Sequence, residues 1–243
     1  MRRTILAVSM AAAALLAASP ARAQAKSELG EKGQFILSAD RLLSLFSYQS
    51  FKTSPDDNNS STESTTGFSL LTSNSSHRTV FDAPRAALDY TIINRLTIGG
   101  SVFVAFDVSH DVTTKTNGTS VSTDQAKGTF WGFAPRVGYI LPISNSVAFW
   151  PRGGLSYIRG TSTNPSNNNA DSSVTLEQLA LDLEPIFVIS PVPHFGITIG
   201  PVIDIPITGN YKSENTINNV TRNTSIDAAQ FYIGASAGLL GYF

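Results

Sequence analysis

Apolar and polar residues alternate with a period of two along most of the chain, and the last fourteen residues show this most clearly. Every second residue from Phe231 to Phe243 is apolar or glycine, whereas the positions between them, from Gln230 to Tyr242, are small, polar or amphipathic. This is the period of a β-strand whose two faces have different surroundings. A strand of about 9–11 residues with an aromatic residue near each end is typical of one that crosses an outer-membrane bilayer.

Eight such segments follow one another. Their connections alternate between short turns and long polar stretches rich in Asn, Ser, Thr and Asp. Short turns on one side and long loops on the other are typical of outer-membrane barrels. The sequence therefore predicts an all-β, antiparallel, up-and-down transmembrane β-barrel of eight strands, with short periplasmic turns and long extracellular loops. The predicted strands span 33–48, 80–92, 96–109, 128–141, 146–159, 174–189, 195–208 and 228–243, with long loops at 49–79, 110–127, 160–173 and 209–227.

The phase of the alternation separates charged from apolar residues. In the segment 128–141, Trp131, Phe133 and Tyr139 share one face and Arg136 occupies the other. A charged side chain on a lipid-facing barrel position costs up to about 2–4 kcal/mol at the bilayer midplane, so the charged face is predicted to line the lumen. A soluble calyx would show the opposite arrangement.

An eight-stranded barrel is only wide enough for side chains to fill it, and buried charges must pair. We therefore expect internal salt bridges to close the lumen. The alternative is a porin-like, narrow pore of low conductance lined by the same residues. The predicted lumen charges are Asp40, Arg85, Asp89, Asp107, Arg136, Arg152, Asp182, Glu184 and Asp204.

Two features interrupt the pattern. Strict alternation places Arg41 on the lipid-facing side, so either it reaches the outer head groups or a bulge near Asp40 turns it inward. Prolines recur inside the predicted strands, where they remove a hydrogen-bond donor, which predicts bulges or bends at one height of the barrel. These prolines are Pro84, Pro135, Pro151, Pro185 and Pro201.

The first residues indicate export. A basic start, an apolar run from Ile5 to Ala18 and the small residues of Ala21-Arg22-Ala23 predict a secretory signal peptide, residues 1–23, cleaved after Ala23. The apolar run is too short to span a membrane. Residues 24–32 then form a short periplasmic lead, and residues 33–243 form the barrel domain.

Composition excludes several classes of function. Removing Arg2, Arg3 and Arg22 with the signal lowers the 17 Lys and Arg residues to 14, against 18 Asp and Glu, so binding to nucleic acid is not expected. Cysteine is absent, which excludes disulfides and thiolate metal sites. Only 14% of the residues are charged, against about 25% in soluble proteins, as dilution by alternation in a barrel predicts.

Catalysis is not expected, and neither is a cofactor or a metal. The three histidines, His77, His110 and His194, fall in or beside predicted loops and one turn. No metal-ligand spacing, phosphate loop or nucleophile motif is present. An outer-membrane enzyme, with His110 between Ser109 and Asp111 as its one candidate, is a third and weaker alternative.

The signal peptide, the eight strands, two bands of outward aromatic residues and the terminal Phe243 together resemble the small eight-stranded bacterial outer-membrane barrels of the OmpA and OmpX type. The resemblance covers essentially all of the mature chain. It implies a monomer in the outer membrane of a Gram-negative bacterium, surrounded by lipid and inserted by the barrel-assembly machinery. It also implies a C-terminal insertion signal formed by Phe231, Ile233, Leu239, Tyr242 and Phe243.

The resemblance conveys fold and location better than activity. The peptidoglycan-binding domain that follows the barrel in some relatives is not expected here. A structural or surface-interaction role is therefore predicted, with an extracellular ligand bound through the loops. In loop 49–79, the apolar segment 67–72 either extends the barrel as a small hairpin or contacts such a partner.

Overall fold

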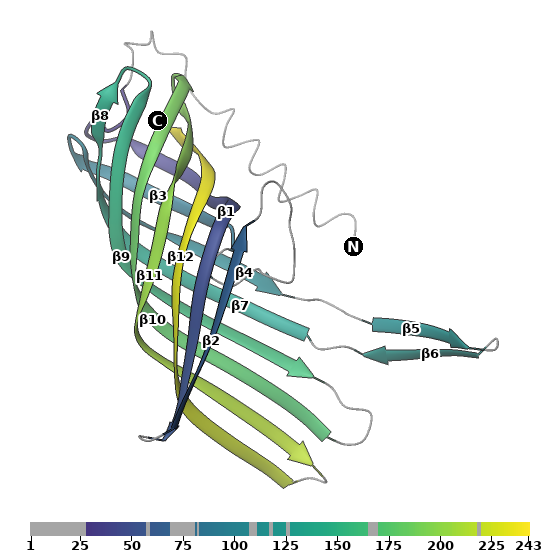
Figure 1. Ribbon diagram of the computed structural model, residues 1–243. Helices are drawn as coiled ribbons and strands as arrows, with labels where there is room; N and C mark the ends of the chain where they lie inside the picture. The colour runs from purple at the N-terminus through teal and green to yellow at the C-terminus, as the bar shows by residue number, and fades with distance from the viewer. Residues whose placement is uncertain are drawn as a thin grey trace.

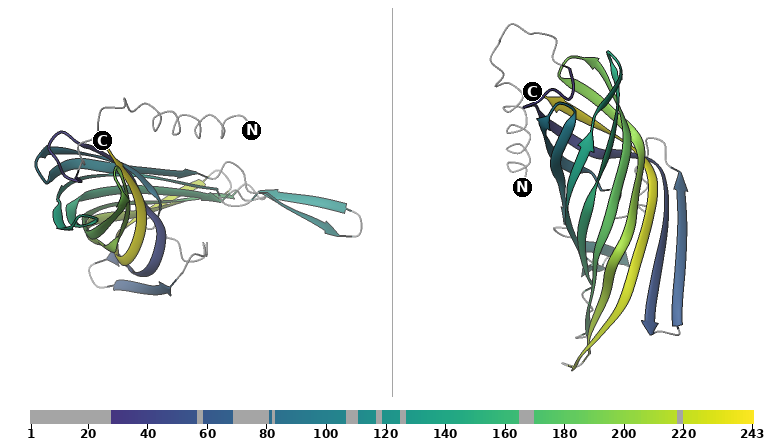
Figure 2. Two further views of the ribbon diagram at one scale, coloured as in Figure 1. Left: turned by 90° about the horizontal axis from the view of Figure 1, so that it is seen from above. Right: turned by 90° about the vertical axis from the view of Figure 1, so that its left-hand side faces the viewer.

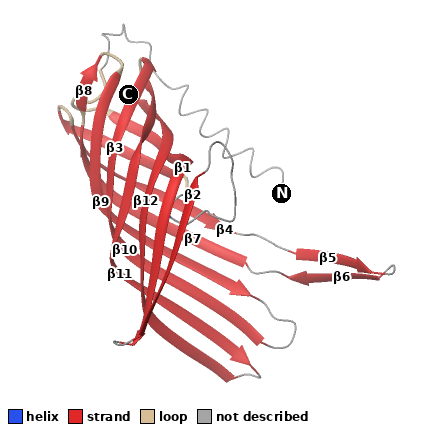
Figure 3. Ribbon diagram, in the orientation of Figure 1, coloured by secondary structure: helices blue, strands red, loops and turns tan. Residues whose placement is uncertain are grey.

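A computed structural model describes residues 28–56, 59–68, 81, 83–106, 111–116, 119–124, 127–164, 170–217 and 220–243. The predicted signal peptide lies outside these ranges. Regular structure in the described part consists of strands (Figure 3). No described helix is long and apolar enough to cross a membrane. The strands are β1 (Phe35–Asp56), β2 (Asn59–Phe68), β3 (Arg85–Ile93), β4 (Leu96–Phe106), β5 (Asp111–Thr116), β6 (Thr119–Asp124), β7 (Lys127–Tyr139), β8 (Leu141–Ser144), β9 (Val147–Asn164), β10 (Ala170–Val192), β11 (Phe195–Ile217) and β12 (Val220–Tyr242).

Eight of these strands close into a ring. The order is β1-β3-β4-β7-β9-β10-β11-β12, and β12 pairs back with β1, so every neighbour is antiparallel. This confirms the predicted up-and-down barrel of eight strands. The short strand β8 follows β7 and pairs with β9. The short turns and the C-terminus gather at one end, and the long hairpins extend from the other (Figure 1).

The long polar connections differ from the prediction, because much of their length is paired strand. The β9–β10 hairpin runs through Asn164 and Ala170, and the β11–β12 hairpin runs through Ile217 and Val220. These parts of the strands are rich in Ser, Thr and Asn and have no apolar face, because both of their faces lie outside the lipid. The period-two signal is therefore lost although the backbone ladder continues.

The region after the first membrane strand forms another hairpin. The far half of β1 pairs with β2, from Phe46–Phe68 to Asp56–Asn59, whereas β3 pairs only with the near half, Phe35 to Asp40. The hairpin alternative for loop 49–79 therefore holds as far as Phe68, and residues 69–80 lie outside the described part. Strands β5 and β6 form a separate hairpin that projects away from the barrel (Figure 2).

The two faces of the wall have the predicted phase. Outward apolar residues are open to the surroundings, with Val104 66% exposed, whereas inward Arg136 and Asp89 are buried. Outward aromatic residues form a band at each end of the barrel. Their close pairs are Phe35–Tyr90, Phe149–Phe187 and, at the hairpin end, Trp131–Tyr157, with ring centroids 4.8, 5.1 and 5.5 Å apart. An apolar exterior around a charged interior is the arrangement of a barrel in lipid.

A bulge in β1 decides the position of Arg41. The register of β1 against β12 shifts between Ala39 and Leu43, and Arg41 has a φ of 54°. Between these positions β1 has two residues more than β12, which lets Asp40 and Arg41, consecutive in the chain, both point into the lumen, where they are 2% and 3% exposed. The bulge alternative is therefore correct, and the head-group alternative is wrong.

Of the bulges or bends predicted at the prolines, the bulges are absent. Pro84 precedes β3, and the register is unchanged on either side of Pro135, Pro151, Pro185 and Pro201. Between β10 and β11 the paired positions instead stop at Leu183–Ile203 and resume at Phe187–Ile199. Pro185 and Pro201 lie opposite each other in this interval. Two residues without an N–H thus share one interruption of the ladder.

Candidate functional site: the lumen charge network

Four arginines and five carboxylates meet inside the barrel, and we call them the lumen charge network. Strands β1, β3, β7, β9, β10 and β11 contribute them. Residues two or four apart on a strand, such as Asp182 and Glu184 on β10, share its inward face. Each of these side chains is buried. The network contains one carboxylate group more than it has guanidinium groups. The members are Asp40, Arg41, Arg85, Asp89, Arg136, Arg152, Asp182, Glu184 and Asp204.

Arg41 is the most extensively bonded member of the network. Its Nη1 lies 3.0 Å from Asp204 Oδ2, and its Nη2 lies 3.0 Å from both Asp182 Oδ1 and Glu184 Oε1. Its Nε donates to Glu184 Oε1 at 3.1 Å, and Nη1 also donates to the carbonyl oxygen of Phe81 at 2.8 Å. The rigid fork of five N–H donors thus connects β1 to two strands on other parts of the wall.

Arg136 and Arg152 complete the other half of the network. Arg136 binds Asp89 through two hydrogen bonds, Nε–Oδ1 at 3.0 Å and Nη2–Oδ2 at 2.6 Å, and its Nη1 lies 2.6 Å from Asp40 Oδ2. Arg152 Nη2 lies 2.6 Å from Glu184 Oε2. Arg41, Arg136 and Arg152 all contact Glu184, which therefore links the two halves.

Arg85 is less completely satisfied. Its Nη1 lies 3.2 Å from Asp182 Oδ2, and its guanidinium lies 5.3 Å from the ring centroid of Phe103. Its Nε and Nη2 are buried and have no acceptor among the described residues. A buried donor without an acceptor is costly, so these two groups mark the place where the network would accept a further polar group.

Apolar side chains cover the network on the side of the short turns, and we call them the turn-side layer. Trp150 is fully buried there, with its Nε1 donating to Thr97 Oγ1 at 3.1 Å and its ring centroid 4.7 Å from the Arg152 guanidinium. Leu29 of the N-terminal lead packs against this layer. Its members are Ile36, Ile140, Ala148, Trp150, Ile186, Val188, Leu240 and Tyr242.

A second apolar cluster, the hairpin-side layer, covers the network on the other side. Phe81 stacks on Tyr232 with ring centroids 5.6 Å apart and an interplanar angle of 16°. Both rings are buried, and the Phe81 carbonyl oxygen accepts the hydrogen bond from Arg41. The members are Phe81, Phe103, Ile158, Val202 and Tyr232, with Ala83 and Phe130 packed against them. The ion pairs are therefore held between two water-poor layers, where their electrostatic interaction is stronger.

Sequence reasoning missed two parts of this site. It left the side of Arg41 open, although a lone charge on a lipid-facing phase was itself the signal of a bulge. It placed Phe81 in a strand, whereas β3 begins at Arg85 and Phe81 precedes it inside the barrel. Asp107, His77 and His110 lie outside the described residues.

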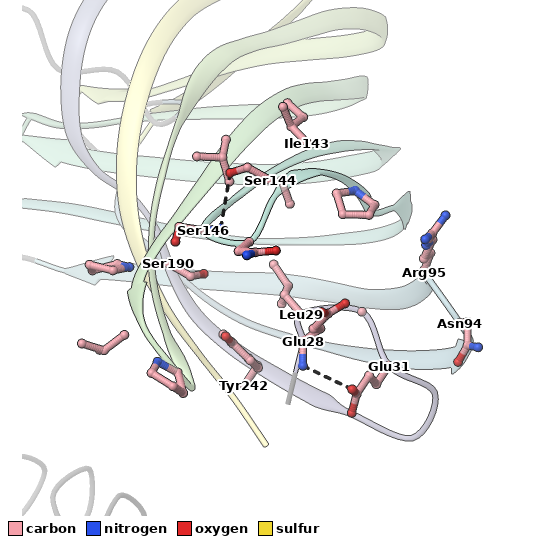
Figure 4. A pocket seen from close by; sticks show the side chains of 18 residues that line it. Glu28, Leu29, Glu31, Asn94, Arg95, Ile143, Ser144, Ser146, Ser190 and Tyr242 are labelled. Carbon is pink, nitrogen blue, oxygen red and sulfur yellow. Dashed lines mark hydrogen bonds between the residues drawn. The ribbon is translucent and has the colours of Figure 1, made fainter. Parts of the chain in front are cut away.

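The N-terminal lead folds under the barrel at the short-turn end. Arg95 N–H donates to the Gly30 carbonyl oxygen at 2.7 Å, and Gly30 N–H donates to Gln34 Oε1 at 2.8 Å. A cavity of about 530 Å³ lies between the lead and the turns near Asn94, Ser144 and Ser190 (Figure 4). No group of His, Asp and Glu in the described part of the chain is arranged to hold a metal ion.

The C-terminal residues divide between the two faces. Phe231, Ile233, Leu239 and Phe243 lie on the outward face, whereas Tyr242 is buried in the turn-side layer. Phe243 and Phe35 exchange two backbone hydrogen bonds, of 2.9 and 3.0 Å. These positions describe how the strand is held in the ring, and the insertion role of the five residues stays a prediction.

Comparison with known proteins finds structural similarity only. No protein-family model matches the sequence, and no curated protein matches it. Among solved structures, the chain is similar to the outer-membrane protein AlkL in lipid bilayers, with a TM-score of 0.47, 12% identity and coverage of 93% of this chain and 97% of AlkL. It is also similar to the outer-membrane protein OprG of Pseudomonas aeruginosa, with a TM-score of 0.46, 15% identity and coverage of 89% and 99%.

A further similar structure is Ail, the attachment invasion locus protein of Yersinia pestis, with a TM-score of 0.32, 13% identity and coverage of 86% of this chain and 99% of Ail. At these identities the likeness concerns the fold alone. The closed ring, the apolar exterior and the charged interior of the chain itself are those of a bacterial outer-membrane β-barrel.

Proposed function

We propose that this outer-membrane β-barrel is a non-conducting protein with a structural or interaction role at the cell surface, and that the lumen charge network closes it. The observation that carries the proposal is the order of three layers along the lumen, apolar, ionic and apolar. An ion entering from either end meets buried hydrophobic side chains before it reaches the charges. Passage would then require breaking ion pairs whose partners become buried and uncompensated, at a cost of about 3–5 kcal/mol for each pair.

The interaction part of the proposal is supported by the hairpins beyond the membrane. Strands β9 to β12 continue as paired, polar strands for several residues past the aromatic band at the hairpin end, and β1 and β2 extend beside them (Figure 1). A regular sheet holds its side chains in fixed positions. It therefore loses less conformational entropy than a flexible loop when it binds a partner. The proposed partner is an extracellular ligand, and the proposal involves no catalysis.

One observation favours the narrow pore as a second candidate. Arg85 Nε and Nη2, together with Arg152 Nε, are buried donors that lack acceptors among the described residues. Water bound to these donors would be the first part of a hydrated path through the network.

Single-channel conductance in a planar bilayer tests the proposal, after a heat-dependent shift in gel mobility has shown that the refolded protein is a barrel. We expect the wild-type protein to be silent. The double variant Phe81→Ala/Arg41→Ala, which removes part of the hairpin-side layer and the central guanidinium, should produce openings from the fraction that still shows the folded gel shift, and this fraction serves as the positive control. Steady wild-type openings that change in Arg136→Ala would instead establish the pore.

A second experiment tests the interaction role. Cells that display the wild-type protein are compared with cells that display a barrel whose β11–β12 hairpin is joined by a short turn after Asn210. Adhesion to host-cell or abiotic surfaces should fall in the trimmed variant while its gel shift is retained. Equal adhesion by both proteins would leave the barrel with a structural role only.

A further inference from the structure

A small group of charged side chains lies on the outer surface of the barrel, immediately above the aromatic band at the hairpin end. Trp131 on β7 is the register partner of Arg159 on β9, and Arg159 is the partner of Glu177 on β10. Partners across an antiparallel ladder share a face, so Arg159 and Glu177 point outward like Trp131. Trp131 is 40% exposed and contacts Tyr157.

Glu177 holds two cations at once. Its Oε1 lies 3.2 Å from Arg159 Nη1, and its Oε2 lies 3.7 Å from Lys212 Nζ on β11. The side chains of Arg159 and Lys212 remain 45% and 55% exposed, whereas that of Glu177 is 25% exposed. We call these residues the outer cationic triad. Its carboxylate positions the two cations, and its excess charge is positive.

The height of the triad on the wall determines what surrounds it. On β9 and β10, the outward positions two residues closer to the membrane centre are Tyr157 and Leu179. The outward positions four residues closer to the membrane centre are Leu155 and Leu181. The triad therefore belongs to the first charged layer outside the lipid-facing band, which also contains Asp227, the exposed partner of Asn210 on β12. Aromatic residues at such a band lie at the level of the lipid head groups, so Arg159 and Lys212 lie there as well.

We propose that the outer cationic triad binds the phosphate of a phosphorylated glycolipid in the outer leaflet of the membrane. A guanidinium group forms paired hydrogen bonds with phosphate oxygens, and an ammonium group adds a point charge. Trp131 lies beside Arg159 on the neighbouring strand, and Tyr157 lies two residues closer to the membrane centre, so that the two rings can contact the sugar and the first carbons of the acyl chains. A soluble anion would use the two cations but would leave these aromatic contacts unused. The proposal does not depend on whether the lumen conducts.

Trp131 also provides the measurement. The chain has two tryptophans, of which Trp131 is exposed beside the triad and Trp150 is fully buried in the lumen. Barrel folded in micelles of an uncharged detergent is titrated with a bis-phosphorylated glucosamine glycolipid, and the change in tryptophan fluorescence gives the binding midpoint. Each basic residue near an anionic lipid surface strengthens binding about fivefold. We therefore expect the midpoint to rise about fivefold in Arg159→Gln and in Lys212→Gln, and further in the double variant.

Arg222→Gln is the matched control. Arg222 is an exposed residue of β12 in the same extended sheet, but it pairs with Asn215 on the face opposite to Lys212 and Ser225. Its loss changes the net charge equally and should leave the midpoint unchanged. A rise as large as that of Arg159→Gln would mean that overall charge, rather than the triad, attracts the lipid, and would overturn the proposal.

Glu177→Gln separates lipid binding from a merely structural ion pair. It removes the competing negative charge, so the lipid midpoint should stay the same or fall while the Arg159→Gln midpoint rises. If the triad only stabilises the strands, all three variants would lower the stability of the barrel and none would change the midpoint. The dephosphorylated glycolipid binding as tightly as the phosphorylated one, or inorganic phosphate alone giving the same signal change, would also overturn the proposal.

Discussion

Asp40 and Arg41 are consecutive in the chain, yet both side chains point into the lumen and join different halves of one charge network. Asp40 accepts hydrogen bonds from Arg136 and Arg152, whereas Arg41 donates to Asp182, Glu184 and Asp204. In a regular strand one of the two would face lipid. The bulge therefore adds a fourth guanidinium group to an interior that already holds five carboxylates.

Removing Arg41 should be severely destabilising. In Arg41→Met the side chain stays long and apolar, but three carboxylates lose their shared cation while they remain buried. Breaking a buried pair in this way costs about 3–5 kcal/mol. Unfolding by urea in lipid vesicles, followed by the gel shift, measures the loss.

Arg159→Met is the control for this change, because it removes an ion pair on the exposed surface. Such pairs contribute about 1 kcal/mol or less, so the urea midpoint should move little. Similar losses in the two variants would show that Arg41 does not hold a buried network.

Phe81→Ala should weaken the barrel through the hairpin-side layer. Phe81 is buried against Tyr232, and truncation of a buried phenylalanine costs about 3–5 kcal/mol because a cavity remains. Phe81→Leu keeps most of the volume and should cost under about 1.5 kcal/mol. The same urea titration distinguishes the two variants, and equal stability of Phe81→Ala and the wild type would place the ring outside the core.

Gly154 and Gly153 are neighbours that should respond oppositely to alanine. A Cβ on Gly154 would overlap the carbonyl oxygen of Pro135 and lie 2.8 Å from the Cα of Arg136, both of them backbone atoms. A Cβ on Gly153 would meet the flexible end of Leu183 at 3.3 Å and the carbonyl oxygen of Asp182 at 3.7 Å, an ordinary van der Waals contact. Gly154→Ala should therefore cost about 1–3 kcal/mol or prevent folding, whereas Gly153→Ala should fold like the wild type. Folded yields on the heat-modifiable gel test this, and normal folding of Gly154→Ala would contradict the close approach of β7 and β9.

The two tryptophans should report opposite sides of the wall. In vesicles of lipids brominated on the acyl chains, Trp131 should be quenched because it faces lipid, and Trp150 should be protected because it is fully buried in the lumen. The variants Trp150→Phe and Trp131→Phe isolate each signal. Strong quenching in Trp131→Phe would mean that the assigned faces of β9 are reversed.

The sequence by itself determined the eight membrane strands, the side of each that faces lipid and the charged character of the lumen. Lipid imposes this requirement on one residue at a time, so alternation along a single strand, such as Trp131 to Tyr139, is enough to detect it. The positions of Asp89, Arg136 and Glu184 inside the barrel follow from that phase alone.

Only the tertiary structure decided the inward turn of Arg41, the entry of Phe81 into the lumen and the pairing of the polar hairpins. The bulge costs backbone regularity in β1, and ion pairs with Asp182 and Asp204, on strands distant in the sequence, compensate for it. The polar strands β9 to β12 continue beyond the lipid because the membrane-spanning part already aligns them. The local sequence signals the bulge only through a lone charge on the lipid-facing phase, and it carries no trace of the paired polar hairpins, since both depend on which strands the closed ring brings together.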